Sequence, residues 1–455
     1  METSHDRDPN SFRLSEVLAA LSHALDMTEG QPVGHAVRTC LLGLRIAEQI
    51  GLTEDDRTSL FYALLMKDAG CSSSSARMSQ LFGVDDLVLK QHGKLVDWSR
   101  PGEVLRFVSR HAGEGVSPLR KVARVGSVAS KLKQEGQEIV ETRCERGANI
   151  VRQLELPEGA AIAVRELDEH WDGGGQPYGL EGDAISIVGR IGCLAQNAEL
   201  FLAAGGREEM RKMVGARRGR WFEPELADAL LAIASDDPIW QSLQGGGERV
   251  LAQIGPADIV LEADSARLDR IAEAFAAIVD AKSHYTALHS EGVARYALAI
   301  GRELGFSPTL LRDLRRGGLL HDIGKLGISN TILDKPGKLD DAEFARIKAH
   351  PVYTEQILSR VPAFAALAGA SSAHHERING SGYPNGLAGN ALTPYSRVLA
   401  VADVFEALTA DRPYRDGMTT DQALEIMQRD AGKHLCSETL AALERSLGTE
   451  ARLAA

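Results

Sequence analysis

The sequence predicts an all-α protein built from two copies of one helical domain. Apolar residues recur every three or four positions, as at Val293, Ala297 and Ile300, which is the spacing of the buried face of a helix. The chain also repeats itself, because three blocks of its first half return in the same order in its second half. We therefore expect tandem helical domains.

The repeat is specific in its spacing. Its blocks lie at 34–70 and 288–324, at 169–180 and 376–387, and, more weakly, at 219–226 and 432–439. In the first block His35 and Asp68 align with His289 and Asp322, and 33 positions separate the two residues in each copy (68 − 35 and 322 − 289). Two unrelated helical domains would produce three collinear matches only by chance, so we favour a repeat of one domain.

The offsets between the copies predict the domain limits. The first block is displaced by 254 positions (288 − 34) and the second by 207 (376 − 169), so the N-terminal copy holds 47 extra residues, between about 72 and 140. Glycine- and proline-rich stretches at 173–182 and 380–389 predict a short hairpin in each copy. We expect an N-terminal domain at 12–235, a linker at 236–263 and a C-terminal domain at 264–450.

The composition is that of an ordinary globular protein, with 44% hydrophobic and 25% charged residues. Its net charge of −12 argues against nucleic acid and anionic membrane surfaces as partners. No apolar run approaches the ~18 residues that suggest a membrane span. The five cysteines lack zinc-knuckle spacing, and the N-terminus does not resemble a secretory signal, so we expect a cytoplasmic protein with reduced thiols.

The C-terminal copy contains a set of residues suited to binding metal. Its members are His289, His321, Asp322, His350, His374, His375 and Asp403. A lone histidine is more often an ordinary core or surface residue, but here Asp322 and Asp403 stand within apolar helical sequence, where a carboxylate is costly unless it is paired or binds metal. Imidazoles with carboxylates suit iron, manganese or zinc. A carboxylate that bridges two such ions supports phosphoryl chemistry.

These residues also carry a family resemblance. The pattern His289…His321-Asp322…Asp403 resembles the HD superfamily of metal-dependent phosphohydrolases, and the segment 374–384 (HHERINGSGYP) resembles the hallmark of its HD-GYP branch. The resemblance covers about 264–450. It implies a helical bundle with a short hairpin and a phosphodiesterase that hydrolyses cyclic dinucleotides, chiefly cyclic di-GMP, to pGpG or GMP with a hydroxide that bridges two metals.

The resemblance also implies a role for each residue. One metal would be held by His289, His321, Asp322 and Asp403, and a second by Asp322, His350, His374 and His375. Lys325 would bind the scissile phosphate and help protonate the leaving oxygen, and Arg412 and Arg415 would hold phosphate oxygens. Tyr285 replaces a glutamate that binds a third metal in some members, so we expect two ions, iron or manganese. Asn379 replaces the usual aspartate before Gly-Ser-Gly, which removes a charge.

The N-terminal copy does not keep this set. It retains His35 and Asp68, but the other positions hold Lys67, Cys71, Arg143, Leu167, Asp168 and Gln196 in place of His321, Lys325, His350, His374, His375 and Asp403. Two ligands of seven cannot hold a dinuclear centre. We expect a degenerate domain with a regulatory or dimerising role in a homodimer, or else a passive partner for stability.

Other functions stay open at this point. The substrate could be cyclic GMP-AMP or another nucleotide phosphate. The chain could instead be a catalytically silent sensor of cyclic dinucleotides, or an adaptor that contacts partner proteins through its hairpin. Loss of metal ligands would favour the last two. Because the ligands are lost only in the N-terminal copy, we favour an enzyme.

Overall fold

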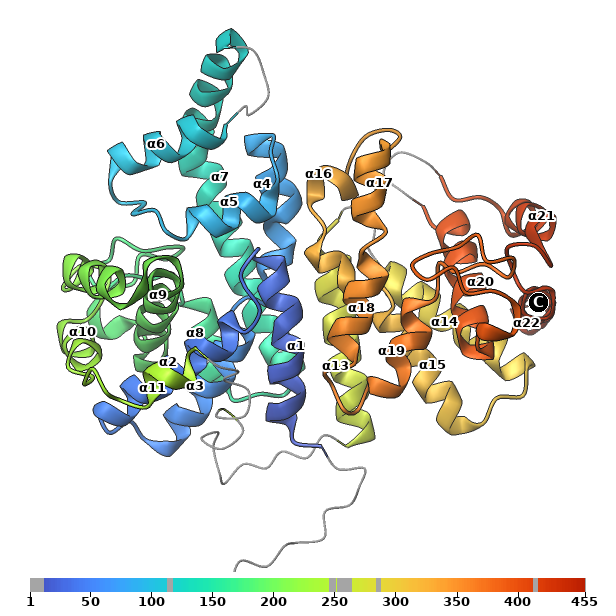
Figure 1. The fold of residues 1–455 in the computed structure, drawn as a ribbon, viewed down its shortest axis with the longest axis horizontal. Coiled ribbons are helices and arrows are strands. Elements are labelled where there is room, and N and C mark those ends of the chain that lie inside the picture. The colour runs from blue at the N-terminus through green and yellow to red at the C-terminus, as the bar shows by residue number, and fades with distance from the viewer. Residues whose placement is uncertain are drawn as a thin grey trace, which may run out of the picture. The chain divides into compact units, whose positions relative to one another are not determined.

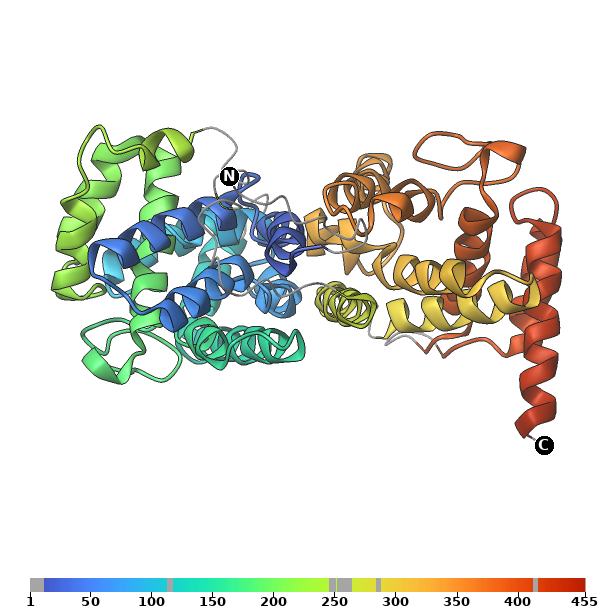
Figure 2. The same cartoon turned by 90° about the horizontal axis from the view of Figure 1, so that it is seen from below.

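The structure, a computed structural model, describes residues 12–112, 118–244, 251, 264–283, 288–411 and 416–454. The chain divides into two compact units, one of Met1–Asp264 with Ser329–Thr331 and the other of Ser265–Ile328 with Ile332–Ala455, and each unit is helical (Figures 1 and 2). Over the described residues only isolated β-bridges accompany the helices, so the all-α prediction is confirmed. In this part of the chain no helix combines the length and the apolar character needed to cross a membrane.

The first half of the chain supplies the helices of the N-terminal unit. They are α1 (Leu14–Thr28), α2 (His35–Gln49), α3 (Glu54–Met66), η1 (Cys71–Ser74), α4 (Ser75–Phe82), α5 (Asp86–Gly93), α6 (Pro101–His111), α7 (Pro118–Gln153), α8 (Glu158–Arg165), η2 (Gly182–Ala184), α9 (Ile187–Arg217), α10 (Pro224–Leu231) and α11 (Ile239–Ser242). The helix α11 lies inside the predicted linker, where Ile239 and Trp240 are buried and α11 packs against α2.

The second half of the chain continues with a shorter series. Its helices are α13 (Ser265–Asp280), α14 (His289–Glu303), α15 (Pro308–Leu320), η3 (Ile323–Gly327), α16 (Asn330–Leu333), α17 (Asp341–Ile347), α18 (His350–Leu358), α19 (Ala365–Ser372), η4 (Gly389–Ala391), α20 (Pro394–Thr409), α21 (Thr420–Asp430) and α22 (Ser437–Ala454).

The repeat in the sequence is also a repeat in the local structure. Thr53 caps α3 by accepting a hydrogen bond from the amide of Asp56, and Ser307, 254 positions later, caps α15 in the same way. The helix packing is repeated too. In the first unit α2, which begins at His35, contacts α3 and α9, and in the second unit α14, which begins at His289, contacts α15 and α20. The same packing therefore positions both copies of the candidate site.

The two predicted hairpins are present, each closed by an antiparallel bridge, between Asp172 and Glu181 and between Asn379 and Ala388. A buried glutamate holds each one. The carboxylate of Glu376 accepts hydrogen bonds from the amides of Asn385 and Leu387, at 2.6 and 3.0 Å, and Glu169 does the same in the first copy.

The extra residues of the N-terminal copy form a separate group of helices. A Cβ added to Gly70 would lie 1.8 Å from the carbonyl oxygen of Arg143, and one added to Gly324 would lie 2.0 Å from that of His350. These close approaches mark equivalent points, and the chain between them is 73 residues long in the first copy (143 − 70) and 26 in the second (350 − 324). The difference of 47 matches the predicted insertion. It contains α4, α5, α6 and the first part of α7, which share an apolar cluster around Phe82, Leu89, Phe107 and Val108.

Candidate metal centre

The seven predicted ligands come from helix ends and from one helix interior. His289 and His350 are the first residues of α14 and α18, His321 and Asp322 follow α15, His374 and His375 follow α19, and Asp403 lies within α20. All are buried except His375, which is partly exposed. The structure brings all seven together.

Asp322 lies at the middle of the group and faces both ways. Its Oδ2 is 3.4 Å from Nε2 of His289 and 3.4 Å from Nε2 of His321. Its Oδ1 is 3.2 Å from Nε2 of His350 and 3.7 Å from Nε2 of His374. Each carboxylate oxygen thus belongs to a different set of imidazoles, which is the arrangement that a bridging carboxylate requires.

Asp403, on α20, lies close to histidines of both groups. Its Oδ1 is 3.4 Å from Nε2 of His289 and 3.9 Å from Nε2 of His321, and its Oδ2 is 3.9 Å from Nδ1 of His375. Donor atoms of His350, His374 and His375 lie within 4.8 Å of one another, as do those of His289, His321 and Asp322. Separations of this size leave room for an ion between the donors.

Second contacts orient the histidines toward the centre. Nδ1 of His321, His350 and His374 lies 2.7, 2.7 and 2.6 Å from the carbonyl oxygens of Gly318, Ile347 and Ser371. A carbonyl can only accept, so each Nδ1 carries the proton and each Nε2 presents a lone pair to the centre.

Glu406, which sequence reasoning missed, plays the same part for His289. It bonds to Nδ1 of His289, and Glu199 bonds to Nδ1 of His35 in the first copy. A signal for this pair was present, because Glu199 and Glu406 are related by the offset of 207 that the second block shows.

The buried polar atoms of the centre and their protonation states fit divalent metal ions. Nε2 of His321 and Oδ1 of Asp322 are buried and have no hydrogen-bond partner among the described residues. Burial lowers the pKa of His375 to about 3, and burial also lowers the pKa of His374. Burial opposes ionisation of Asp322, but Lys325 and His321 outweigh it and lower the pKa of Asp322. Neutral imidazoles and ionised carboxylates are the forms that bind metal.

Of the three residues predicted to bind phosphate, the structure describes one, Lys325. Lys325 is partly exposed at the edge of the centre and donates a hydrogen bond to Asp322. Arg412 and Arg415 lie outside the described residues, as does Tyr285. Asn379 lies in the hairpin, where its Oδ1 accepts hydrogen bonds from the amide and hydroxyl of Ser381.

The equivalent place in the N-terminal unit is filled by an ammonium group. Nζ of Lys67 lies 2.9 Å from Nε2 of His35 and donates to Asp68. The remaining cavity there is about 10 Å³, at most the space of one water molecule, and Arg143 forms an ion pair with Asp168 beside it. In this copy the cation belongs to the chain itself.

The fold and the centre define a duplicated HD domain in which one copy keeps all seven predicted ligands. The family model described as HD domain matches residues 120–216 and 273–438, and the chain belongs to this family, as the resemblance predicted.

Two relatives and one solved structure are particularly informative. The chain is 42% identical over 440 residues to 3′3′-cGAMP-specific phosphodiesterase 3 of Vibrio cholerae, and the match covers 96% of this chain and 95% of that protein. It is 38% identical over 165 residues to a cyclic di-GMP phosphodiesterase of Pseudomonas aeruginosa, with coverage of 36% and 40%. The crystal structure of a cyclic GMP-AMP-specific phosphodiesterase of V. cholerae matches with a TM-score of 0.66 at 38% identity, over 96% of this chain and 98% of that one.

Proposed function

We propose that the chain is a metal-dependent phosphodiesterase that hydrolyses 3′3′-cyclic GMP-AMP at the centre of its C-terminal unit. The observation that carries the chemistry is Asp322, whose two oxygens face two separate sets of histidines. Such a donor set suits two divalent ions, and iron or manganese matches its imidazole and carboxylate ligands.

The substrate is inferred from the relatives. The sequence alone favoured cyclic di-GMP, with cyclic GMP-AMP as an alternative. The relative that matches over nearly the whole of both chains is specific for 3′3′-cGAMP, whereas the cyclic di-GMP phosphodiesterase of P. aeruginosa matches over 36% of this chain. The comparisons thus favour the alternative.

The residues of the centre would have two roles, metal binding and phosphate binding. His289, His321, Asp322 and Asp403 would hold one ion, and His350, His374, His375 and Asp322 the other. Bound there, two divalent ions activate a water as the nucleophile and neutralise phosphate charge. Lys325 would bind a phosphate oxygen and supply a proton to the leaving oxygen, because its ammonium group lies beside Asp322 at the exposed edge of the centre.

A direct comparison of substrates tests this proposal. The full chain, purified without oxygen and loaded with Mn²⁺ or Fe²⁺, is assayed with 3′3′-cGAMP and with cyclic di-GMP. We expect kcat/KM to be at least about tenfold higher for 3′3′-cGAMP, a difference of about 1.4 kcal/mol in transition-state binding. A preference for cyclic di-GMP would overturn the substrate assignment. Tight binding of either nucleotide without hydrolysis by the metal-loaded protein would favour a sensor instead.

A matched pair of variants tests the site. Asp322→Asn removes the charge of the bridging carboxylate and should abolish both hydrolysis and metal retention. His434→Asn changes a histidine of the same unit that bonds Asp430 and does not contribute to the centre, so it should retain both. Equal activity in the two variants would show that the assigned site is wrong.

A further inference from the structure

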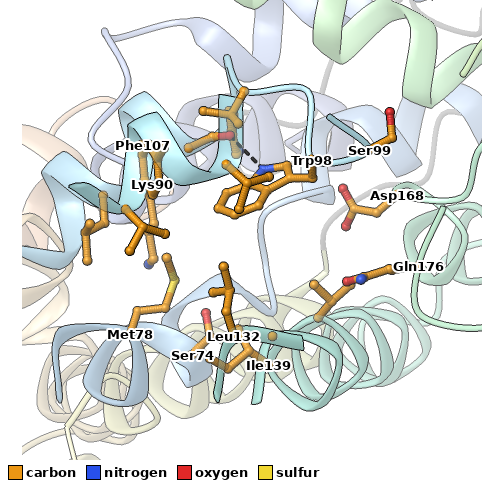
Figure 3. A pocket seen from close by; sticks show the side chains of 18 of the residues that line it. Ser74, Met78, Lys90, Trp98, Ser99, Phe107, Leu132, Ile139, Asp168 and Gln176 are labelled. Atoms are coloured by element: carbon orange, nitrogen blue, oxygen red, sulfur yellow. Dashed lines mark hydrogen bonds between the residues drawn. The ribbon is translucent and has the colours of Figure 1, made fainter. Parts of the chain in front are cut away.

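A cavity of about 760 Å³ lies within the N-terminal unit. It is lined largely by the inserted helices α4 to α6, the segment that joins α5 to α6, and the first part of α7. Figure 3 shows Trp98 and Phe107 on one side of it and Met78, Leu132 and Ile139 on the opposite side. Protein interiors rarely leave voids much larger than a water molecule, and this volume is that of a small-molecule site.

Most of the side chains drawn around the cavity in Figure 3 are apolar, and so are two exposed residues that line it. Leu81, Phe82, Leu89 and Val108 add to the side chains already named. Trp98 and Leu105 line the cavity and are also exposed, at 43% and 57%. A ligand would therefore enter past apolar side chains and place an apolar body among the helices.

The cations that line the cavity are already neutralised by the protein. Nζ of Lys90 lies 3.4 Å from Glu29 and donates to the carbonyl oxygens of Thr28 and Cys71 and to the hydroxyl of Ser75. Nζ of Lys94 lies 2.7 Å from Glu29 and 3.0 Å from Asp68. Arg143 pairs with Asp168. A phosphate or carboxylate would have to displace a buried ion pair, which disfavours an anionic ligand.

Two residues that line the cavity carry a polar atom without a partner. Nε1 of Trp221 and Nδ1 of His170 are buried without a hydrogen bond among the described residues, and the two residues are only 8% and 9% exposed. Their rings stack with centroids 3.9 Å apart. Burial lowers the pKa of His170 to about 4, so its imidazole is neutral at neutral pH. Buried groups of this kind are costly unless something bonds to them.

We propose that this cavity binds an uncharged amphipathic small molecule. Its apolar body packs among α4 to α7, and a hydroxyl, carbonyl or amide head bonds to Trp221 and His170. The site is separate from the metal centre of the C-terminal unit and does not depend on the proposed hydrolysis.

Binding of a neutral fluorescent probe tests the proposal on the full chain. N-phenyl-1-naphthylamine should bind with increased emission, and decanamide should displace it at about a tenfold lower concentration than decanoate or decylammonium, because the charged heads lose solvation in the cavity. All four tryptophans, at 98, 171, 221 and 240, lie in the N-terminal unit, so their fluorescence reports on the unit that holds the cavity. Displacement by decanoate or by 3′3′-cGAMP at concentrations equal to or lower than those of decanamide would overturn the proposal.

Two glycines of α7 provide a matched pair of variants. Gly136 lines the cavity and Gly126 does not, and a Cβ added to either meets no atom within 4 Å. Leucine favours a helix more than glycine at both positions, so neither change should unfold the unit. Gly136→Leu should fill the cavity and weaken probe binding about tenfold or more, whereas Gly126→Leu should change it less than about twofold. Equal binding to both variants, or no binding to the unaltered protein, would refute the site.

The position of the head group has its own test. Trp221→Phe removes the indole N–H but keeps an aromatic ring against His170. We expect the affinity for decanamide to fall about three- to tenfold, the worth of one hydrogen bond, while that for the naphthylamine changes less than twofold. Equal losses for both molecules would show that the head does not lie at Trp221.

Discussion

The two copies of the domain share one scaffold and differ in the cation that the scaffold holds. In the first copy the ammonium group of Lys67 lies against His35 and Asp68. In the second copy Asp322 faces histidines across gaps of 3.2 Å and more, which suit a metal ion. A carboxylate buried in this fold needs a positive partner, and either a lysine or an ion can supply it. Loss of the metal therefore does not require loss of the fold.

The largest effect is expected from converting the second centre into the first. His321→Lys should place an ammonium group beside Asp322, exclude an ion and reduce kcat/KM by about a thousandfold or more, while the unit stays folded as the first copy does. Metal analysis and the hydrolysis assay measure this, with His434→Lys as the control. Retention of more than a tenth of the activity would mean that His321 does not hold a catalytic ion.

Removing the ammonium group from the first copy should destabilise the N-terminal unit. Lys67→Met leaves the buried Asp68 with Lys94 as its nearest remaining cation, so the free energy of unfolding should fall by about 3 kcal/mol. Urea titration followed by tryptophan fluorescence reads this unit alone. The exposed Lys131, which lies 3.8 Å from Glu135, provides the control Lys131→Met, expected to change stability by less than about 0.5 kcal/mol. A loss no larger than that of the control would show that Lys67 does not replace a metal in stabilising the fold.

The comparison also shows what a sequence can predict. The cluster of histidines and aspartates was predictable because such residues in apolar helical sequence are costly without a partner, and because the first copy showed which of them the fold can lose. Glu406 was missed because a glutamate in a helix is usually solvated, and only its repetition as Glu199 distinguished it. The cavity was not predictable either, since the apolar spacing of Phe82, Leu89 and Phe107 is the same whether side chains or a ligand fill the space between them.

Glu406 gives the next expected effect. Glu406→Gln weakens the orientation and basicity of His289, and metal affinity should fall about 10- to 100-fold, as measured by titration of the metal-free protein. The matched change Glu199→Gln acts on His35, which holds no ion, so it should leave metal affinity unchanged. Similar affinities for both variants would place Glu406 outside the metal centre.

The free energy of unfolding of the N-terminal unit should also depend on pH through His170. The pKa of His170 is lowered by burial from 6.5 to about 4, so the folded state binds fewer protons than the unfolded state between these values. The stability that neutral His170 contributes is therefore complete above about pH 6.5 and is lost as the pH falls to about 4, by about 3 kcal/mol. His170→Phe should flatten this part of the profile when urea unfolding is followed by tryptophan fluorescence. The same slope in both proteins would exclude His170 as its source.

The smallest effect is expected at Asn379, where this chain departs from the usual aspartate. The side chain of Asn379 bonds to Ser381 in an exposed turn, as Asp172 bonds to the amide of Gly174 in the first hairpin. An oxygen acceptor is what the turn requires, and asparagine and aspartate both supply one. Asn379→Asp should therefore change kcat/KM and metal content by less than about twofold, whereas Asn379→Ala removes the acceptor and should loosen the hairpin. A large gain in activity from Asn379→Asp would mean that the missing charge, rather than the missing hydrogen bond, limits this centre.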